Sequence, residues 1–165
     1  MRALVLYRSF HGNTKAVAEA MAGELVSLGH EAVVQDLRRR LPDLGSFDCA
    51  LVGAPTRMAR VTGKALRVLK RIAKKGFAEK PVAIFDTYGP VPATPEELEK
   101  GRKWIIPGAA GMMEKAAKDA GLHVFAKTLR CEVTGLNGPL KEDEQQNAAA
   151  FARELASGLH GAAAR

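Results

Sequence analysis

Short apolar runs alternate along the chain with longer segments in which apolar residues recur at helical spacing. The apolar runs predict strands over residues 3–7, 32–37, 48–54, 81–87 and 123–133. Continuous runs of this length are typical of strands that are buried on both faces of a parallel sheet. The helical spacing predicts helices over residues 13–28, 62–75, 108–120 and 141–159.

This alternation predicts an α/β fold with three layers, a doubly wound five-stranded parallel sheet covered by helices on both faces. For 165 residues, the flavodoxin-like strand order 2-1-3-4-5 fits best, and the whole chain (1–165) forms one domain. Ligands of such sheets bind beyond the carboxyl ends of the strands, where the strand order reverses. The chemistry is therefore expected in the loops that follow strands one, three and four.

The loop after the first strand is Arg8-Ser9-Phe10-His11-Gly12-Asn13-Thr14, and a helix begins at its end. The first N–H groups of a helix have no acceptor within the helix, and this end of the helix dipole is positive. Hydroxyl and amide side chains around a flexible glycine complete a site for an anion, most simply a phosphate group. The alternative is that Asn13 only caps the helix.

Two further loops should share that rim: Gly53-Ala54-Pro55-Thr56 with Arg57 and Met58, and Thr87-Tyr88-Gly89. With the first loop and the closing Gly138-Pro139-Leu140, they make nearly the whole chain resemble the flavodoxin family. The resemblance implies FMN as cofactor. It assigns the phosphate to Ser9, Phe10, His11, Gly12, Asn13 and Thr14, and the flavin ring to Pro55, Thr56, Arg57, Met58, Thr87, Tyr88 and Gly89.

The chain departs from the family pattern at three of these positions. His11 stands where the family usually has Thr, and it either donates to the phosphate or points to solvent. Arg57 and Met58 stand where many relatives have Trp or Tyr, so one ring face is covered by either side chain or left open. Tyr88 is the only aromatic residue of the two ring loops, and it either stacks on the ring or packs on the rim.

The positive charge of the second loop has a redox consequence if the cofactor is FMN. Acidic surroundings in electron-transfer flavodoxins disfavour the anionic reduced ring, whereas Arg57 and Arg60 would favour it. One charge at about 5 Å in an effective dielectric near 20 contributes roughly 3 kcal/mol before screening. We therefore expect a less negative potential than acidic flavodoxins show.

Residues 91–107 form an insertion that simple flavodoxins lack at this point. Thr94-Pro95-Glu96-Glu97 has the pattern of a helix start, so a short helix is expected to about Trp104. Trp104, Ile105 and Ile106 then form a lid over a substrate, a contact in a homodimer, or simple packing of the insertion onto the body.

The net charge is +7, and nine basic residues against one acid lie between residues 57 and 80. This run is either the solvated face of one helix or a surface for an acidic partner, a nucleotide phosphate or a nucleic acid. Cys49 and Cys131 lie in separate predicted strands, too far apart for a disulfide, and are expected to be buried. Neither a leader nor a membrane segment is recognisable, so a cytoplasmic location is expected.

Three functions are consistent with these features. The first is an FMN protein that passes electrons between redox partners or to a small-molecule acceptor, with no catalytic residue of its own. The second is an FMN-dependent NAD(P)H:quinone-type oxidoreductase, so the sequence leaves open whether the protein is an enzyme. The third is a flavin-free binding module. We expect an acidic partner, and neither a metal, a membrane nor a nucleic acid, since the basic run lacks interleaved aromatic residues.

Overall fold

The computed structural model describes the backbone of residues 1–163 and the side chains of residues 1–159. The last two residues of the expected 1–165 domain lie outside the described residues. The strands are β1 (Arg2–Tyr7), β2 (Glu31–Asp36), β3 (Cys49–Pro55), β4 (Pro81–Tyr88) and β5 (His123–Glu132). The helices are α1 (Asn13–Ser27), α2 (Gly63–Ile72), α3 (Pro95–Ile105), α4 (Gly108–Asp119) and α5 (Glu144–Ala163).

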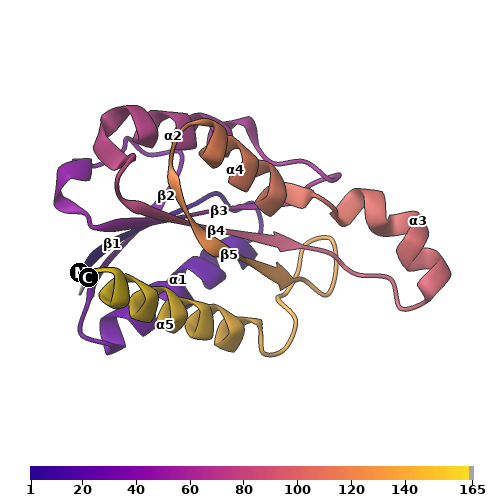
Figure 1. Cartoon of the computed structure of the whole chain (residues 1–165). Helices are drawn as coiled ribbons and strands as arrows, with labels where there is room; N and C mark the ends of the chain where they lie inside the picture. The colour runs from indigo at the N-terminus through magenta and orange to yellow at the C-terminus, as the bar shows by residue number, and fades with distance from the viewer. Residues whose placement is uncertain (164–165) are drawn as a thin grey trace.

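The five strands form one parallel sheet in the order β2-β1-β3-β4-β5, which confirms the predicted fold and strand order. Helices α1 and α5 cover one face, and α2 and α4 cover the other (Figure 1). Each face has its own buried apolar cluster, because the central strands are apolar on both sides. No helix in the described part of the chain is long and apolar enough to cross a membrane.

Three helix boundaries differ from the predicted ones by three or more residues, including the end of the last helix, which is Ala163 rather than residue 159. The second predicted helix ends at Ile72 and continues as a wider turn, Ala73–Phe77, in which Gly76 has a φ of +88°. The last helix begins at Glu144 rather than at residue 141, because Leu140 still pairs with Val133 and Lys141 N–H donates to the Glu132 carbonyl. The segment after β5 thus extends the edge of the sheet before the helix begins.

Both cysteines are free and buried, as expected. They lie in β3 and β5, on either side of β4, so they cannot form a disulfide. Burial, followed by the charge of Asp48, raises the pKa of the Cys49 thiol to about 12. Burial and Glu144 raise the pKa of Cys131 as well. Both side chains therefore act as small apolar core residues and stay protonated at neutral pH.

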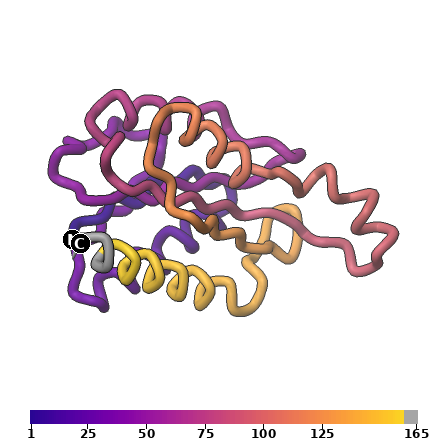
Figure 2. The backbone as a smooth tube through the Cα atoms, viewed as in Figure 1, coloured from indigo at the N-terminus to yellow at the C-terminus, as the bar shows by residue number. Residues whose placement is uncertain are grey.

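The insertion leaves the sheet as an arm. Figure 2 shows the chain running out from the end of β4, turning and coming back to the start of α4. None of the α3 residues is buried. The helix starts as predicted, because the Thr94 hydroxyl accepts from the Glu97 N–H at 3.3 Å and Pro95 follows the cap. Trp104 and Ile106 are each 50% exposed and Ile105 is partly buried, and the three expected roles of these residues stay predictions.

Gly53 gives a direct test of how tightly the centre of the sheet is packed. It pairs with Phe85 across β3 and β4, and a Cβ at Gly53 would overlap the Phe85 ring. We expect Gly53→Ala to destabilise the protein by about 1–3 kcal/mol, measured by urea unfolding. The control is Gly23→Ala inside α1, where a Cβ meets no atom within 4 Å and should stabilise by about 0.5–1 kcal/mol. Equal effects of the two substitutions would contradict this packing.

Candidate functional site

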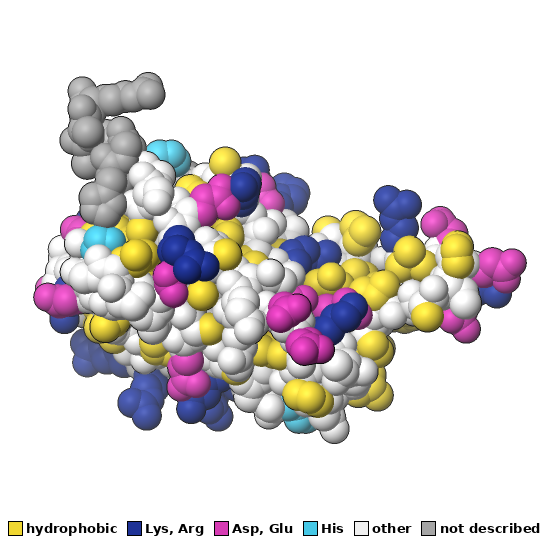
Figure 3. All heavy atoms as spheres, turned by 90° about the horizontal axis from the view of Figure 1, so that it is seen from below, with side chains coloured by type: hydrophobic (Ala, Val, Ile, Leu, Met, Phe, Trp, Pro, Cys, Tyr) yellow, Lys and Arg dark blue, Asp and Glu magenta, His cyan; other side chains and the backbone are white. Residues whose placement is uncertain are grey.

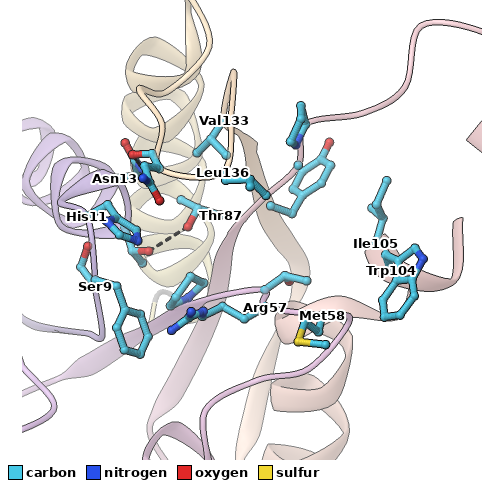
Figure 4. Close-up of a pocket in the computed structure, with 18 of the residues that line it drawn as sticks. Ser9, His11, Asn13, Arg57, Met58, Thr87, Trp104, Ile105, Val133 and Leu136 are labelled. Atoms are coloured by element: carbon cyan, nitrogen blue, oxygen red, sulfur yellow. Dashed lines mark hydrogen bonds between the residues drawn. The ribbon is translucent and has the colours of Figure 1, made fainter. Parts of the chain in front are cut away.

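A pocket of about 550 Å³ opens at the carboxyl rim of the sheet, between the loops that follow β1, β3 and β4. Figure 4 shows Ser9, His11 and Asn13 on one side of it and Trp104 and Ile105 on the opposite side. Its lining comprises Ser9, Phe10, His11, Asn13, Thr14, Pro55, Thr56, Arg57, Met58, Thr87, Tyr88, Gly89, Pro90, Pro92, Gly101, Trp104, Ile105, Val133, Leu136 and Asn137. The three loops named from the sequence thus meet at one site.

Of the predicted site residues, only Gly12 is absent from this lining. Gly12 is the N-cap of α1 and has a φ of +90°, a conformation that a residue with a Cβ rarely adopts. It therefore shapes the loop instead of lining the pocket. Asn13 is the first helical residue and its side chain makes no cap hydrogen bond, so the capping alternative for Asn13 is wrong.

The loop Ser9–Thr14 fits a phosphate group on the geometry of its backbone. Ala16 N–H is the first to find an acceptor in α1, the Gly12 carbonyl at 2.9 Å, so the N–H groups of residues 13–15 lack intrahelical partners. The Ser9 Oγ accepts from Gly12 N–H at 3.0 Å, and its own O–H can still donate. The first turn contains no acidic side chain to repel an anion.

Two side chains of this loop also link it to neighbouring loops. Asn13 Nδ2 donates to the Asn137 carbonyl at 3.1 Å, and a Cβ at Gly138 would overlap the Asn13 amide. The Thr14 hydroxyl is buried and lies 2.8 Å from the Thr87 hydroxyl, the hydrogen bond drawn in Figure 4. Sequence reasoning considered Thr14 as a phosphate ligand and Asn13 as a phosphate ligand or a helix cap. In the structure, the Asn13 and Thr14 side chains also connect three segments of the chain around the pocket.

The second loop is a tight hairpin in which Arg57 and Arg60 exchange two backbone hydrogen bonds of 2.9 Å. Met58 and Ala59 at its tip have positive φ values of 48° and 61°, and Met58 is 77% exposed. Positive φ is uncommon for such residues, and here it closes the tight turn between Arg57 and Arg60. Arg57 lines the pocket, whereas Arg60 does not, so only Arg57 can act on a bound ring at short range.

Arg57 is held in place by an aromatic side chain of the first loop. Its guanidinium lies 4.5 Å from the centre of the Phe10 ring, and that of Arg8 lies 4.1 Å from the same ring. Cation–π contacts of this kind contribute about 0.5–1 kcal/mol each at exposed sites. Phe10 therefore holds positive charge beside the anion loop, although it is itself 42% exposed.

Tyr88, the only aromatic residue of the ring loops, is fixed by a cation from the next strand. The Arg130 guanidinium lies 4.4 Å from its ring centre. Burial, and then the charge of Glu132, raises the pKa of Tyr88, so it remains a neutral phenol at pH 7. A neutral, half-buried aromatic ring at the pocket wall is suited to contact a flat ligand.

The buried carboxylate of Asp86 organises the rim, and sequence reasoning assigned it no role. Arg130 donates to its two oxygens at 3.0 Å each, and the Thr56 hydroxyl donates to Oδ2 at 2.7 Å. Ala110 N–H at the start of α4 donates to the same oxygen at 3.1 Å. The available signal was a lone acidic residue in the otherwise apolar run 81–86, which needs a buried partner.

The α3 arm contributes the outer wall of the pocket. Trp104 is 50% exposed, yet it lines the pocket with Ile105 and Pro92. The arm is anchored where it rejoins the body, because Arg130 also donates to the Ile105 carbonyl at 2.9 Å. Figure 3 shows hydrophobic side chains gathered on the arm and along its junction with the body. The arm is therefore placed to cover a ligand in the pocket.

Comparisons with known proteins agree with this geometry. Residues 4–131 match the family model of the flavodoxin domain. The fold is similar to that of a flavodoxin from the domain Archaea, with 21% identity and a TM-score of 0.75. The match covers 97% of this chain and 99% of the archaeal one. Flavodoxin 2 from Bacillus cereus gives 22% identity and a TM-score of 0.70, with coverages of 96% and 99%.

A flavodiiron core from Synechocystis sp. PCC6803 matches with 17% identity and a TM-score of 0.74. The match covers 98% of this chain but only 36% of that larger chain. No match was found among functionally curated proteins. Identities this low establish the shared fold alone, but the family model spans most of the chain, including the loops after β1, β3 and β4. The chain belongs to the flavodoxin domain family.

Proposed function

We propose that the protein binds FMN in the rim pocket and carries electrons between redox partners. The observation that carries this proposal is the meeting of three loops around one pocket, with the N-terminus of α1 at one end and Tyr88 in its wall. Family membership supports it independently. Bound FMN would supply the redox chemistry, and the protein would set its potential and its access to partners.

The residues divide between the two ends of the pocket. The backbone N–H groups of residues 10–14 and the Ser9 hydroxyl would hold the phosphate, with Arg8 and Arg57 adding positive charge around Phe10. Tyr88 and the 56–58 loop would contact the ring. No side chain of the pocket is assigned a proton-transfer role, which is consistent with an electron carrier.

A second candidate function is an FMN-dependent reductase of quinone-type acceptors. The wall that Pro92, Trp104 and Ile105 form offers apolar surface for a flat substrate beside the ring. Oxidation of NAD(P)H by the FMN-loaded protein, with a quinone as acceptor, separates the two functions. Turnover lost in Trp104→Ala would favour the reductase, and no turnover would favour the electron carrier.

The phosphate assignment predicts a large difference between FMN and riboflavin, which lacks the phosphate. We expect FMN to bind at least about 100-fold more tightly, because the charge-assisted hydrogen bonds of the loop would be absent with riboflavin. Ser9→Ala should weaken FMN binding about tenfold and leave riboflavin binding unchanged, in titrations that follow the quenching of flavin fluorescence.

The control is Ser27→Ala, at the far end of α1, where the hydroxyl donates to the Glu24 carbonyl. This variant should bind both flavins as the wild type does. Equal affinities of the wild type for FMN and riboflavin would contradict the phosphate site. So would a Ser9→Ala effect that is the same for both flavins, since it would indicate general damage to the pocket.

The position of Arg57 predicts its effect on the redox potential. Arg57→Glu replaces a positive by a negative charge at the pocket wall and should lower the potential for reduction to the anionic flavin by on the order of tens of millivolts. Arg60→Glu makes the same change of charge outside the pocket lining and should shift the potential much less. A redox titration monitored by absorbance measures both, and an unchanged potential in Arg57→Glu would exclude the proposed electrostatic role.

A further inference from the structure

A second cavity, of about 730 Å³, lies along α2. Its lining differs from that of the rim pocket in composition and charge. We call this cavity the basic groove. It is formed by α2, the turn that follows α2, and the segment after β2, and its lining is Leu37, Arg38, Arg39, Arg40, Leu41, Lys64, Arg67, Val68, Lys70, Arg71, Lys74 and Lys75. Nine of these residues are basic and none is acidic.

The positive charge of the basic groove is almost unneutralised. Arg38 donates hydrogen bonds to both carboxylate oxygens of Asp36, and these bonds raise the pKa of the Arg38 guanidinium. Within the part of the chain whose side chains are described, the structure shows no ion pair for the other eight cations. Like charges so close together repel each other, and a bound polyanion relieves this repulsion.

Cations elsewhere on the surface are arranged differently. On α4, Lys115 pairs with Asp119 at 2.8 Å and Lys118 with Glu114 at 2.5 Å, and on α1 Lys15 pairs with Glu19 at 3.4 Å. Figure 3 shows the face of the molecule opposite α2, where acidic and basic side chains are interspersed. Among the described residues, α1 and α4 thus carry paired charges, whereas α2 and α3 do not, and α2 differs from α3 in having no acidic side chain among its basic ones.

The basic groove runs toward the mouth of the rim pocket. Lys64, Arg67 and Arg71 recur every three or four residues along α2, and Lys74 continues this line in the turn that follows. Lys64 is six residues after Met58, which lines the pocket, and six residues span at most about 20 Å. The Lys64 end of the basic groove therefore lies within about 20 Å of a residue that lines the proposed flavin site.

We propose that the basic groove is the docking site for an acidic redox protein, which would exchange electrons with the rim pocket. This inference rests on the proposed function. An acidic protein fits better than a nucleic acid, because the lining contains no aromatic side chain for base stacking and has three apolar residues, Leu37, Leu41 and Val68, for side-chain packing. A partner that binds along α2 would extend toward the loop of Arg57 and Met58 at the proposed flavin site.

The test measures binding to a defined probe, a fluorescein-labelled acidic [2Fe–2S] ferredoxin, by fluorescence anisotropy at about 20 and about 150 mM NaCl. The groove variant carries Arg67→Gln, Arg71→Gln and Lys74→Gln. The control variant loses the same charge elsewhere, through Lys118→Gln, Lys127→Gln and Arg153→Gln, each of which removes only an exposed ion pair. FMN binding by both variants is measured separately and should equal that of the wild type.

We expect the groove variant to bind the ferredoxin at least about tenfold more weakly at low salt and the control variant less than about twofold more weakly. Equal weakening of both variants would overturn the proposal, because net charge alone would then explain the binding. Tighter binding of a duplex DNA or of anionic lipid vesicles than of ferredoxin at about 150 mM NaCl, lost in the groove variant, would also overturn it. A wild type that binds ferredoxin through the groove without binding FMN would refute the proposed function and keep the docking site.

Discussion

The rim of this sheet depends on one buried charge, the carboxylate of Asp86. Its two oxygens accept from Arg130 on β5, the Thr56 hydroxyl after β3 and the Ala110 N–H at the start of α4. A buried carboxylate is tolerated only where such donors surround it, so it fixes the relative positions of the elements that supply them. Through Arg130, the same charge fixes the Tyr88 ring and the base of the α3 arm.

The architecture could be predicted from the sequence because local and global signals agree. Predominantly apolar runs are typical of strands buried in a covered parallel sheet, and the intervening helical patterns supply the cover. The meeting of Ser9, Thr56 and Tyr88 at one pocket follows from strand order, since the carboxyl ends of parallel strands lie at one rim. Only helix ends at irregular turns, such as the one at Gly76, fell outside this reasoning.

The side-chain network could not be predicted, because it depends on register. Along the start of the β4–β5 pair, Val82 lies opposite Val124, but an irregularity shifts the pairing by two residues, so that Asp86 lies opposite Arg130 rather than Thr128. The sequence of β5 contains no local pattern that predicts this shift in pairing. The partners of Asn13 and Thr14 were also missed, because Asn137 and Thr87 are distant from them in the sequence.

In the function proposed above, the rim pocket would hold the cofactor and the basic groove would hold a partner, and this function requires FMN to bind in the pocket. A crystal structure of the protein grown with FMN tests this most directly. The account predicts the phosphate at the backbone N–H groups of residues 10–14 and the ring between the loops of Met58 and Tyr88. A phosphate bound among the arginines of the basic groove, with the rim pocket empty, would contradict it.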